Sequence, residues 1–172
     1  MKKRGGGMKR IGFALVMMSL SGSVWADKQN IGDWIVDVQP GLSEAYTGND
    51  SGSVFGFLCS ADSCSAYLDV NSQCDENSSI PMLINAESGS AYVTAKCTHF
   101  SQAGSVRYIS VIDDKQIATV ISSGAAIGFA IPMLSGEFKV VRFSLDGALR
   151  AADLAVDAAK ASKVKRFEDV RL

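Results

Sequence analysis

The sequence contains only one histidine, His99. A Ser-His-Asp or Cys-His catalytic arrangement needs an imidazole as its base, so any such site would have to use this residue. No serine lies in a G-x-S-x-G turn, because the nearest phrase, Ser122-Ser123-Gly124, lacks the preceding glycine. No G-K-S/T follows Gly124 or Gly128, which excludes a phosphate-binding loop of that type. A small hydrolase that uses His99 is therefore the enzymatic alternative, and a surface or turn position beside Cys97 is the simpler interpretation.

The sequence also lacks a hydrophobic run long enough to cross a membrane. Its purest apolar stretch, residues 11–20, would rise about 15 Å as a helix, half of the roughly 30 Å hydrocarbon core. A basic segment without acids precedes this stretch, and the small-x-small tripeptide Val24-Trp25-Ala26 follows it. This order is typical of a secretory signal peptide, residues 1–26, with cleavage after Ala26 and a mature chain that starts at Asp27. Met8 is an alternative start, since Lys9-Arg10 would still supply the basic segment.

Two other export routes are excluded by missing residues. A lipoprotein would need a cysteine just after the apolar stretch, and the first cysteine is Cys59. A twin-arginine signal would need paired arginines, and only Lys9-Arg10 is present. We expect the protein to be periplasmic or secreted.

The segment 27–172 has a clear acidic excess. Five of the 17 basic residues and none of the 18 acidic residues lie in residues 1–26, which leaves 12 against 18 and a formal net charge of −6. Nucleic acid and anionic membranes require clustered Lys and Arg, so neither is an expected partner. The one basic cluster, Lys160 to Arg166, is typical of a solvated helix end. The length of residues 27–172 fits one domain with its own core. We expect no transmembrane segment in this part of the chain.

Four cysteines are present, Cys59, Cys64, Cys74 and Cys97. An even number in an exported protein predicts two disulfides, and three connectivities are possible. We favour Cys59–Cys64 with Cys74–Cys97, because the first pair would face each other across a hairpin. Zinc bound by cysteines and His99 is the competing interpretation, and the oxidising compartment argues against it.

Acidic side chains do not complete a metal motif elsewhere. Asp69, Asn71, Asp75 and Glu76 crowd one loop, but Cys74 and Ile80 occupy the positions where an EF-hand needs glycine and glutamate. We expect no metal and no cofactor.

Short apolar or alternating runs predict a mainly β chain of the α+β type. We expect strands at residues 31–38, 54–59, 65–70, 80–85, 91–97, 106–112, 127–132 and 138–143, and loops at 41–53 and 71–79. Two helices are expected, a short one near 114–123 and an amphipathic C-terminal one near 145–161. The apolar side of the second helix would include Leu145, Ala148, Leu149, Ala152, Ala155, Val156 and Ala159. These elements favour an antiparallel sandwich or a strongly curved sheet that a helix closes.

Four large aromatic residues are candidate binding anchors: Trp34, Tyr46, Tyr92 and Tyr108. Trp and Tyr dominate interface hot spots, but core packing is the more frequent fate of such residues in a strand. The sequence leaves these two roles open.

Two phrases resemble a known family. Gly32-Asp33-Trp34, together with the order Ile117–Ser123, Gly124, an apolar strand and Phe143-Ser144-Leu145-Asp146-Gly147-Ala148, is similar to the invasion-associated locus B family of small exported bacterial proteins. The resemblance covers about the final third of the chain and one short N-terminal phrase. It implies an envelope or host-interaction role and no reaction, since that family has no established catalytic residues to carry over.

Together these features predict an exported, non-enzymatic protein that binds a protein, glycan or envelope partner. The alternatives are the hydrolase based on His99 and an envelope-stress structural protein without a discrete ligand.

Overall fold

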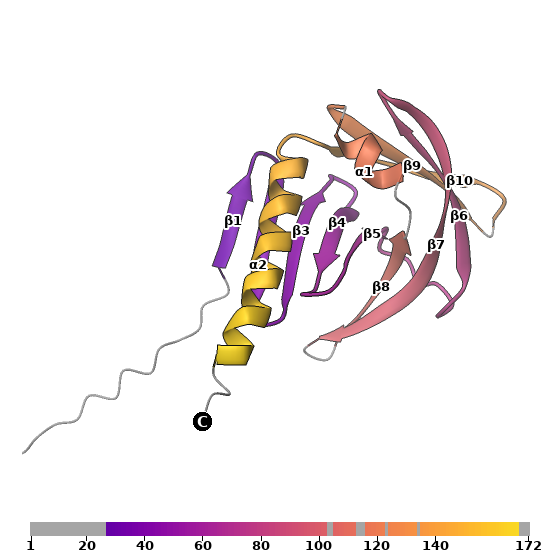
Figure 1. Cartoon of the computed structure of the whole chain (residues 1–172). Helices are drawn as coiled ribbons and strands as arrows, with labels where there is room; N and C mark the ends of the chain where they lie inside the picture. Colours follow the sequence, from indigo (N-terminus) through magenta and orange to yellow (C-terminus); the bar gives the residue numbers. More distant parts are fainter. Residues whose placement is uncertain (1–26, 103–104, 113–115, 123, 134, 169–172) are drawn as a thin grey trace, which may run out of the picture.

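The computed structural model describes residues 27–102, 105–112, 116–122, 124–133 and 135–168 (Figure 1). The predicted signal peptide therefore lies outside the described residues. Ten strands form one antiparallel sheet in the order β1-β2-β3-β4-β5-β8-β7-β6-β9-β10. The strands are β1 (Asp27–Ile31), β2 (Trp34–Gln39), β3 (Leu42–Gly48), β4 (Val54–Cys59), β5 (Cys64–Asp69), β6 (Ser79–Ala86), β7 (Gly89–Gln102), β8 (Ser105–Ile112), β9 (Ala126–Pro132) and β10 (Phe138–Ser144), and the helices are α1 (Gln116–Ile121) and α2 (Ala148–Glu168).

The sheet is strongly curved, so its two ends come together around one core. In Figure 1, α2 runs along β1 to β4, while β9 and β10 cross the molecule near the end of α2 that joins β10. Ring contacts connect the ends: Phe55 of β4 lies 5.0 Å from Phe129 of β9 and 5.8 Å from Phe143 of β10, measured between ring centroids. The mainly β fold with a curved antiparallel sheet and a C-terminal helix is confirmed.

Alternation along each strand decides which side chains enter the core. Successive residues of a strand point to opposite faces. The register pairs Val36 with Ala45 and Ala45 with Phe57, so these three share the face that encloses the core. All three are buried. We call this the inner face and the opposite side of the sheet the outer face.

Helix α2 packs on the inner face through alanines. Ala148, Ala151, Ala155 and Ala159 are all buried, at the spacing of one helical side. Leu149, which was expected on this side, is 47% exposed, and Ala151 takes a place in the core instead. The small side chains bring the helix backbone close to β2, β3 and β4, with which it is in contact.

Strand β3 corrects one prediction, since residues 41–53 were expected to form a loop. Its inward residues Ser43, Ala45 and Thr47 are buried. They are small or polar because α2 lies directly over them, so the apolar alternation that marks a strand is missing. Strand β1 was also not expected, because its sequence DKQNI is mostly polar and it forms an edge of the sheet.

Two disulfides are present with the expected connectivity. Cys59 and Cys64 are paired residues of β4 and β5, with Cα atoms 4.0 Å apart. Cys74 and Cys97 join the loop before β6 to β7, with Cα atoms 6.1 Å apart. Among the described residues, no helix has the length and apolar character needed to span a membrane.

Candidate functional site

The Gly32-Asp33-Trp34 phrase lies against the junction between β10 and α2. The backbone N–H of Asp33 donates to the carbonyl oxygen of Asp146 at 3.1 Å. The indole Nε1 of Trp34 donates to the carbonyl oxygen of Ser144 at 3.0 Å. We call this contact region the turn–helix junction, and it comprises Gly32, Asp33, Trp34, Ser144, Asp146 and Gly147.

Two glycines allow the backbones at the turn–helix junction to touch. Gly32 has φ +56°, and a Cβ there would lie 2.7 Å from the carbonyl oxygen of Asp146. Gly147 has φ +87°, and a Cβ there would overlap the carbonyl oxygen of Ile31. Only glycine combines positive φ with such a close approach. The two phrases that carried the family resemblance are therefore in mutual contact, and their role is to fix the first hairpin to the last helix.

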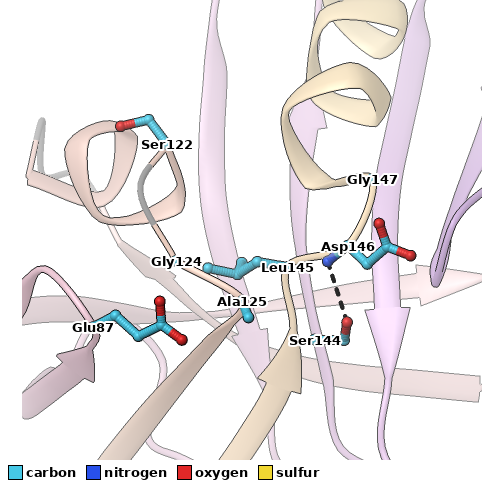
Figure 2. A pocket seen from close by; sticks show the side chains of 8 residues that line it. All are labelled: Glu87, Ser122, Gly124, Ala125, Ser144, Leu145, Asp146 and Gly147. Atoms are coloured by element: carbon cyan, nitrogen blue, oxygen red, sulfur yellow. Dashed lines mark hydrogen bonds between the residues drawn. The ribbon is translucent and has the colours of Figure 1, made fainter.

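A shallow pocket of about 660 Å³ lies beside the turn–helix junction (Figure 2). Its lining residues are Glu87, Ser122, Gly124, Ala125, Ser144, Leu145, Asp146 and Gly147. In Figure 2 the Glu87 and Asp146 carboxylates lie at opposite ends, with Ala125 and Leu145 between them. The carboxylates therefore do not form a close pair.

The hydroxyl groups of this pocket are already engaged with the backbone. Ser122 Oγ donates to the carbonyl oxygen of Thr119 at 2.7 Å, and Ser144 Oγ accepts from the N–H of Asp146 at 3.2 Å. A serine nucleophile needs an adjacent base to take its proton, and no histidine lines this pocket. The described lining residues therefore include no nucleophile–base pair.

His99 lies on β7, close to the second disulfide. Its Nδ1 is 3.3 Å from Oε1 of Glu76, and both side chains are substantially exposed. A carboxylate beside an imidazole can orient it, as in a catalytic triad. The neighbouring Cys97 supplies no thiolate, because it is bonded to Cys74. A hydrolase that uses His99 stays a prediction.

The described residues contain no group of three or more His, Cys, Asp or Glu side chains that could hold a metal ion. One charged pair lies at the edge of the outer face, where Lys28 Nζ is 3.2 Å from Asp37 Oδ2. The hydrogen bond to Asp37 and the nearby Tyr46 raise the pKa of Lys28 above its usual value. This pair joins β1 to β2.

The four aromatic candidates are in different environments. Trp34 has no exposed surface and stacks on Phe57 with ring centroids 5.7 Å apart, so it belongs to the core. Tyr46 is half-buried on the outer face of β3. Tyr92 is 66% exposed. Tyr108 pairs with His99 in the sheet, and its side chain lies outside the part of the chain that the structure describes.

Tyr92 belongs to an apolar row that crosses four strands of the outer face. The register aligns Tyr92 of β7 with Leu83 of β6, Leu83 with Ala130 of β9, and Ala130 with Val140 of β10. Tyr92, Leu83 and Val140 are 66%, 46% and 60% exposed. Directly paired residues in adjacent strands have Cβ atoms about 5 Å apart, so these side chains form a continuous row.

Phe138 widens this row on β10. It is 67% exposed and lies two residues before Val140, on the same face. At about 200 Å² per aromatic side chain, Tyr92 and Phe138 alone present roughly 270 Å² of mostly apolar surface. The largest apolar patch on a typical monomeric protein is about 300–600 Å² and often functional, so a row that adds Leu83 and Val140 to this area is a candidate interaction site. We call Tyr92, Leu83, Ala130, Val140 and Phe138 the outer apolar row.

Sequence analysis identified only Tyr92 of this row. Leu83 lies in the run Met82-Leu83-Ile84, and Val140 is followed by Val141. Met82, Ile84 and Val141 are buried. Leu83 and Val140 are exposed. Apolar residues at consecutive positions of a strand place apolar side chains on both faces of the sheet. These consecutive residues were the sequence signal that could have identified an exposed apolar face.

Comparisons with known proteins give a likeness in structure alone. No family model matches the sequence, and no curated protein matches it. Among solved structures, the crystal structure of invasion associated protein B from Bartonella henselae matches with a TM-score of 0.56. The match has 15% sequence identity and covers 77% of this chain and 98% of that one. At this identity the likeness shows the fold.

Proposed function

We propose that this protein is an exported, non-enzymatic binding protein that contacts another macromolecule through the outer apolar row. The observation that carries the proposal is the alignment of Tyr92, Leu83 and Val140, with Phe138, on one exposed face. Exposing these side chains to water is unfavourable, and a partner that covers them would recover that free energy. Among the described residues, neither the pocket beside the turn–helix junction nor the Glu76–His99 pair combines a nucleophile with a base, so an enzymatic role has less support.

Export is part of the same proposal. Residues 1–26 have the composition of a secretory signal, and two disulfides are of the kind that persist in an oxidising compartment. The compartment is the periplasm or the exterior of the cell. The predicted cleavage follows Ala26.

We also propose remote membership of the invasion-associated locus B family, with an envelope or host-interaction role. The structural likeness to the Bartonella protein supports a shared fold. The turn–helix junction adds support, since the two phrases that resemble the family meet there. An interaction role agrees with a stable scaffold that presents an exposed apolar face.

A photo-cross-linking experiment in the cell tests the binding role. A photo-reactive phenylalanine analogue replaces Tyr92, and the control protein carries it at Ala161, an exposed position on α2. We expect one discrete adduct from position 92 and none of the same mass from position 161. The adduct should disappear when Val140 is changed to Ser in the same protein, because this removes apolar surface from the other end of the same row, three strands from position 92.

Two results would contradict the binding role. One is the same set of adducts from positions 92 and 161, which would indicate random collision. The other is an adduct at position 92 that the Val140→Ser change does not weaken. Circular dichroism of each variant checks that the fold is retained.

A further inference from the structure

The outer apolar row lies between two cations. Arg142 follows Val140 by two residues on β10 and is exposed on the same face. Its Cγ lies 3.5 Å from the point where a Cβ on Gly128 would be, so its stem lies over β9. Lys96 is exposed on β7, four residues after Tyr92 and on the same face. Arg142 and Lys96 are on opposite sides of the row.

The separation of these cations sets a length for the ligand. The strand order places β7 and β10 three strands apart in this part of the sheet. With about 4.8 Å between strands and about 7 Å between same-face residues along a strand, a flat sheet would separate the two side-chain positions by roughly 25 Å. An extended segment of about seven residues has this length.

Among the described strand positions that face outward around the row, no carboxylate accompanies the two cations. The outward positions of β6, β9 and β10, and of β7 where it pairs with β6, are Ser79, Pro81, Leu83 and Asn85 of β6, Ser90, Tyr92, Thr94 and Lys96 of β7, Ala126, Gly128, Ala130 and Pro132 of β9, and Phe138, Val140, Arg142 and Ser144 of β10. The segment 27–172 nevertheless has a formal net charge of −6, from 12 basic and 18 acidic residues. The face is thus locally positive on a negative protein.

This charge distribution argues against a second copy of the chain as the occupant. A two-fold symmetric interface places the same surface on both sides. The cations of one copy would then face a surface without any carboxylate. Buried or half-buried like charges without a counter-charge cost free energy on association.

The distribution also argues against an anionic bilayer. Attraction to acidic lipids needs several basic residues, at about 1 kcal/mol each, and the described outward positions around the row hold two. The acidic remainder of the protein would be repelled by the same surface. A discrete partner with few, well-placed charges fits better.

We propose that the outer apolar row binds a polypeptide segment that has an apolar centre flanked by carboxylates. The apolar side chains would cover Tyr92, Leu83 and Val140, and the carboxylates would pair with Arg142 at one end and Lys96 at the other. This inference rests on the proposed function, because it names the partner class for the same surface.

A peptide-display selection tests the inference. A random library of 12-residue peptides is selected on the disulfide-bonded protein and counter-selected on the capture support alone. The affinities of the recovered peptides are measured by fluorescence anisotropy. We expect recovered sequences to have net negative charge and aromatic or aliphatic residues, and their binding to weaken as salt is added.

Variants then separate the apolar and charged contributions. Val140→Ser or Tyr92→Ala should weaken binding at least tenfold, as expected for a central apolar contact. Arg142→Glu should weaken it about tenfold, since it replaces an attraction by a repulsion, while Arg142→Lys should stay within threefold. Lys160→Glu, at an exposed position of α2, is the matched charge reversal and should have no effect.

Failure of the inference and failure of the proposed function give different results. Recovered peptides that are neutral or basic would overturn the acidic partner and keep the binding role. Peptides whose affinity is unchanged by Arg142→Glu but weakened by Val140→Ser would do the same. Recovered peptides that ignore both Val140→Ser and Tyr92→Ala would overturn both. Binding to phosphatidylserine vesicles, or self-association in sedimentation runs, would replace the acidic polypeptide if either one depends on Val140.

Discussion

Single glycines hold the two ends of this chain together. At the turn–helix junction, Gly32 and Gly147 both have positive φ, and each lies where a Cβ would collide with backbone. Backbone cannot move aside as a flexible side chain can, so these positions tolerate no larger residue. The same contact directs the Trp34 indole into its hydrogen bond with Ser144.

The first prediction compares two glycines of similar backbone conformation. Gly147 and Gly136 have φ +87° and +84°, but a Cβ on Gly136 would have open space around it. Gly136→Ala should lower the free energy of unfolding by about 1–2 kcal/mol, the cost of positive φ for an L residue. Gly147→Ala should lower it by about 2–5 kcal/mol, because displacement of packed backbone is added. Guanidinium unfolding of both variants checks this, and equal losses would contradict the close contact.

The second prediction concerns the two aromatic residues with opposite environments. Trp34→Ala removes a fully buried ring and its hydrogen bond, so it should lower the free energy of unfolding by about 3–5 kcal/mol. Tyr92→Ala, at a 66% exposed position, should change it by no more than about 0.5 kcal/mol. Thermal unfolding measures both. A large loss of unfolding free energy for Tyr92→Ala would mean that Tyr92 stabilises the fold, which would contradict its assignment to a partner-binding surface.

Residue type alone did not separate these two aromatics at the level of the sequence. Trp34 and Tyr92 were both candidate anchors, because Trp and Tyr dominate interface hot spots. Their burial depends on the register of distant strands: Trp34 packs between β4 and the end of β10, while Tyr92 faces outward beside Leu83. Register is a long-range property, so a local pattern cannot supply it.

At the scale of elements, the small side chains of β3 and the alanine face of α2 depend on each other. The hairpin of β4 and β5 was predictable, because two short runs with aromatic and aliphatic side chains flank a polar turn. Strand β3 was not, because a helix with an alanine face leaves room only for Ser43, Ala45 and Thr47 beneath it. The pattern of one element is therefore set by another that follows about 100 residues later in the chain.

The third prediction tests this close packing. Ala155→Leu adds three carbon atoms to a fully buried position and should lower the free energy of unfolding by about 1–3 kcal/mol. Ala161→Leu makes the same change at an exposed position of the same helix and should have an effect within about 0.5 kcal/mol. Equal effects in chemical unfolding would indicate that α2 does not pack tightly on β3.

The fourth prediction ranks the two disulfides. The bonds close segments with sequence separations of 5 and 23 residues. In the chain-entropy model, loss of Cys59–Cys64 costs about 2 kcal/mol and loss of Cys74–Cys97 about 3.5 kcal/mol. Paired Cys→Ala variants, unfolded in guanidinium chloride, should follow this order. The reverse order would show that the environment of the Cys59–Cys64 hairpin outweighs loop length.

At the scale of the whole molecule, the proposed export would be coupled to stability. The disulfides form in an oxidising compartment, and the predicted signal at residues 1–26 is the feature that would deliver the chain there. A chain retained in the cytoplasm would keep its thiols reduced. It would then lack the stabilisation that both bonds provide.

The fifth prediction follows from this coupling. In a Gram-negative host the full chain should yield a periplasmic protein whose N-terminal residue is Asp27 and which has no free thiols. Leu15→Arg places a charge in the apolar stretch of the signal, so this variant should stay in the cytoplasm with residues 1–26 attached and four free thiols. Leu83→Arg is the matched control, because it adds the same charge at an exposed position of β6 and should not affect export. N-terminal sequencing and thiol titration of each fraction measure the outcome. Periplasmic Leu15→Arg protein, or a cytoplasmic wild-type chain with free thiols, would contradict the signal. Either result would also mean that the predicted signal does not deliver the chain to the compartment in which its disulfides would form.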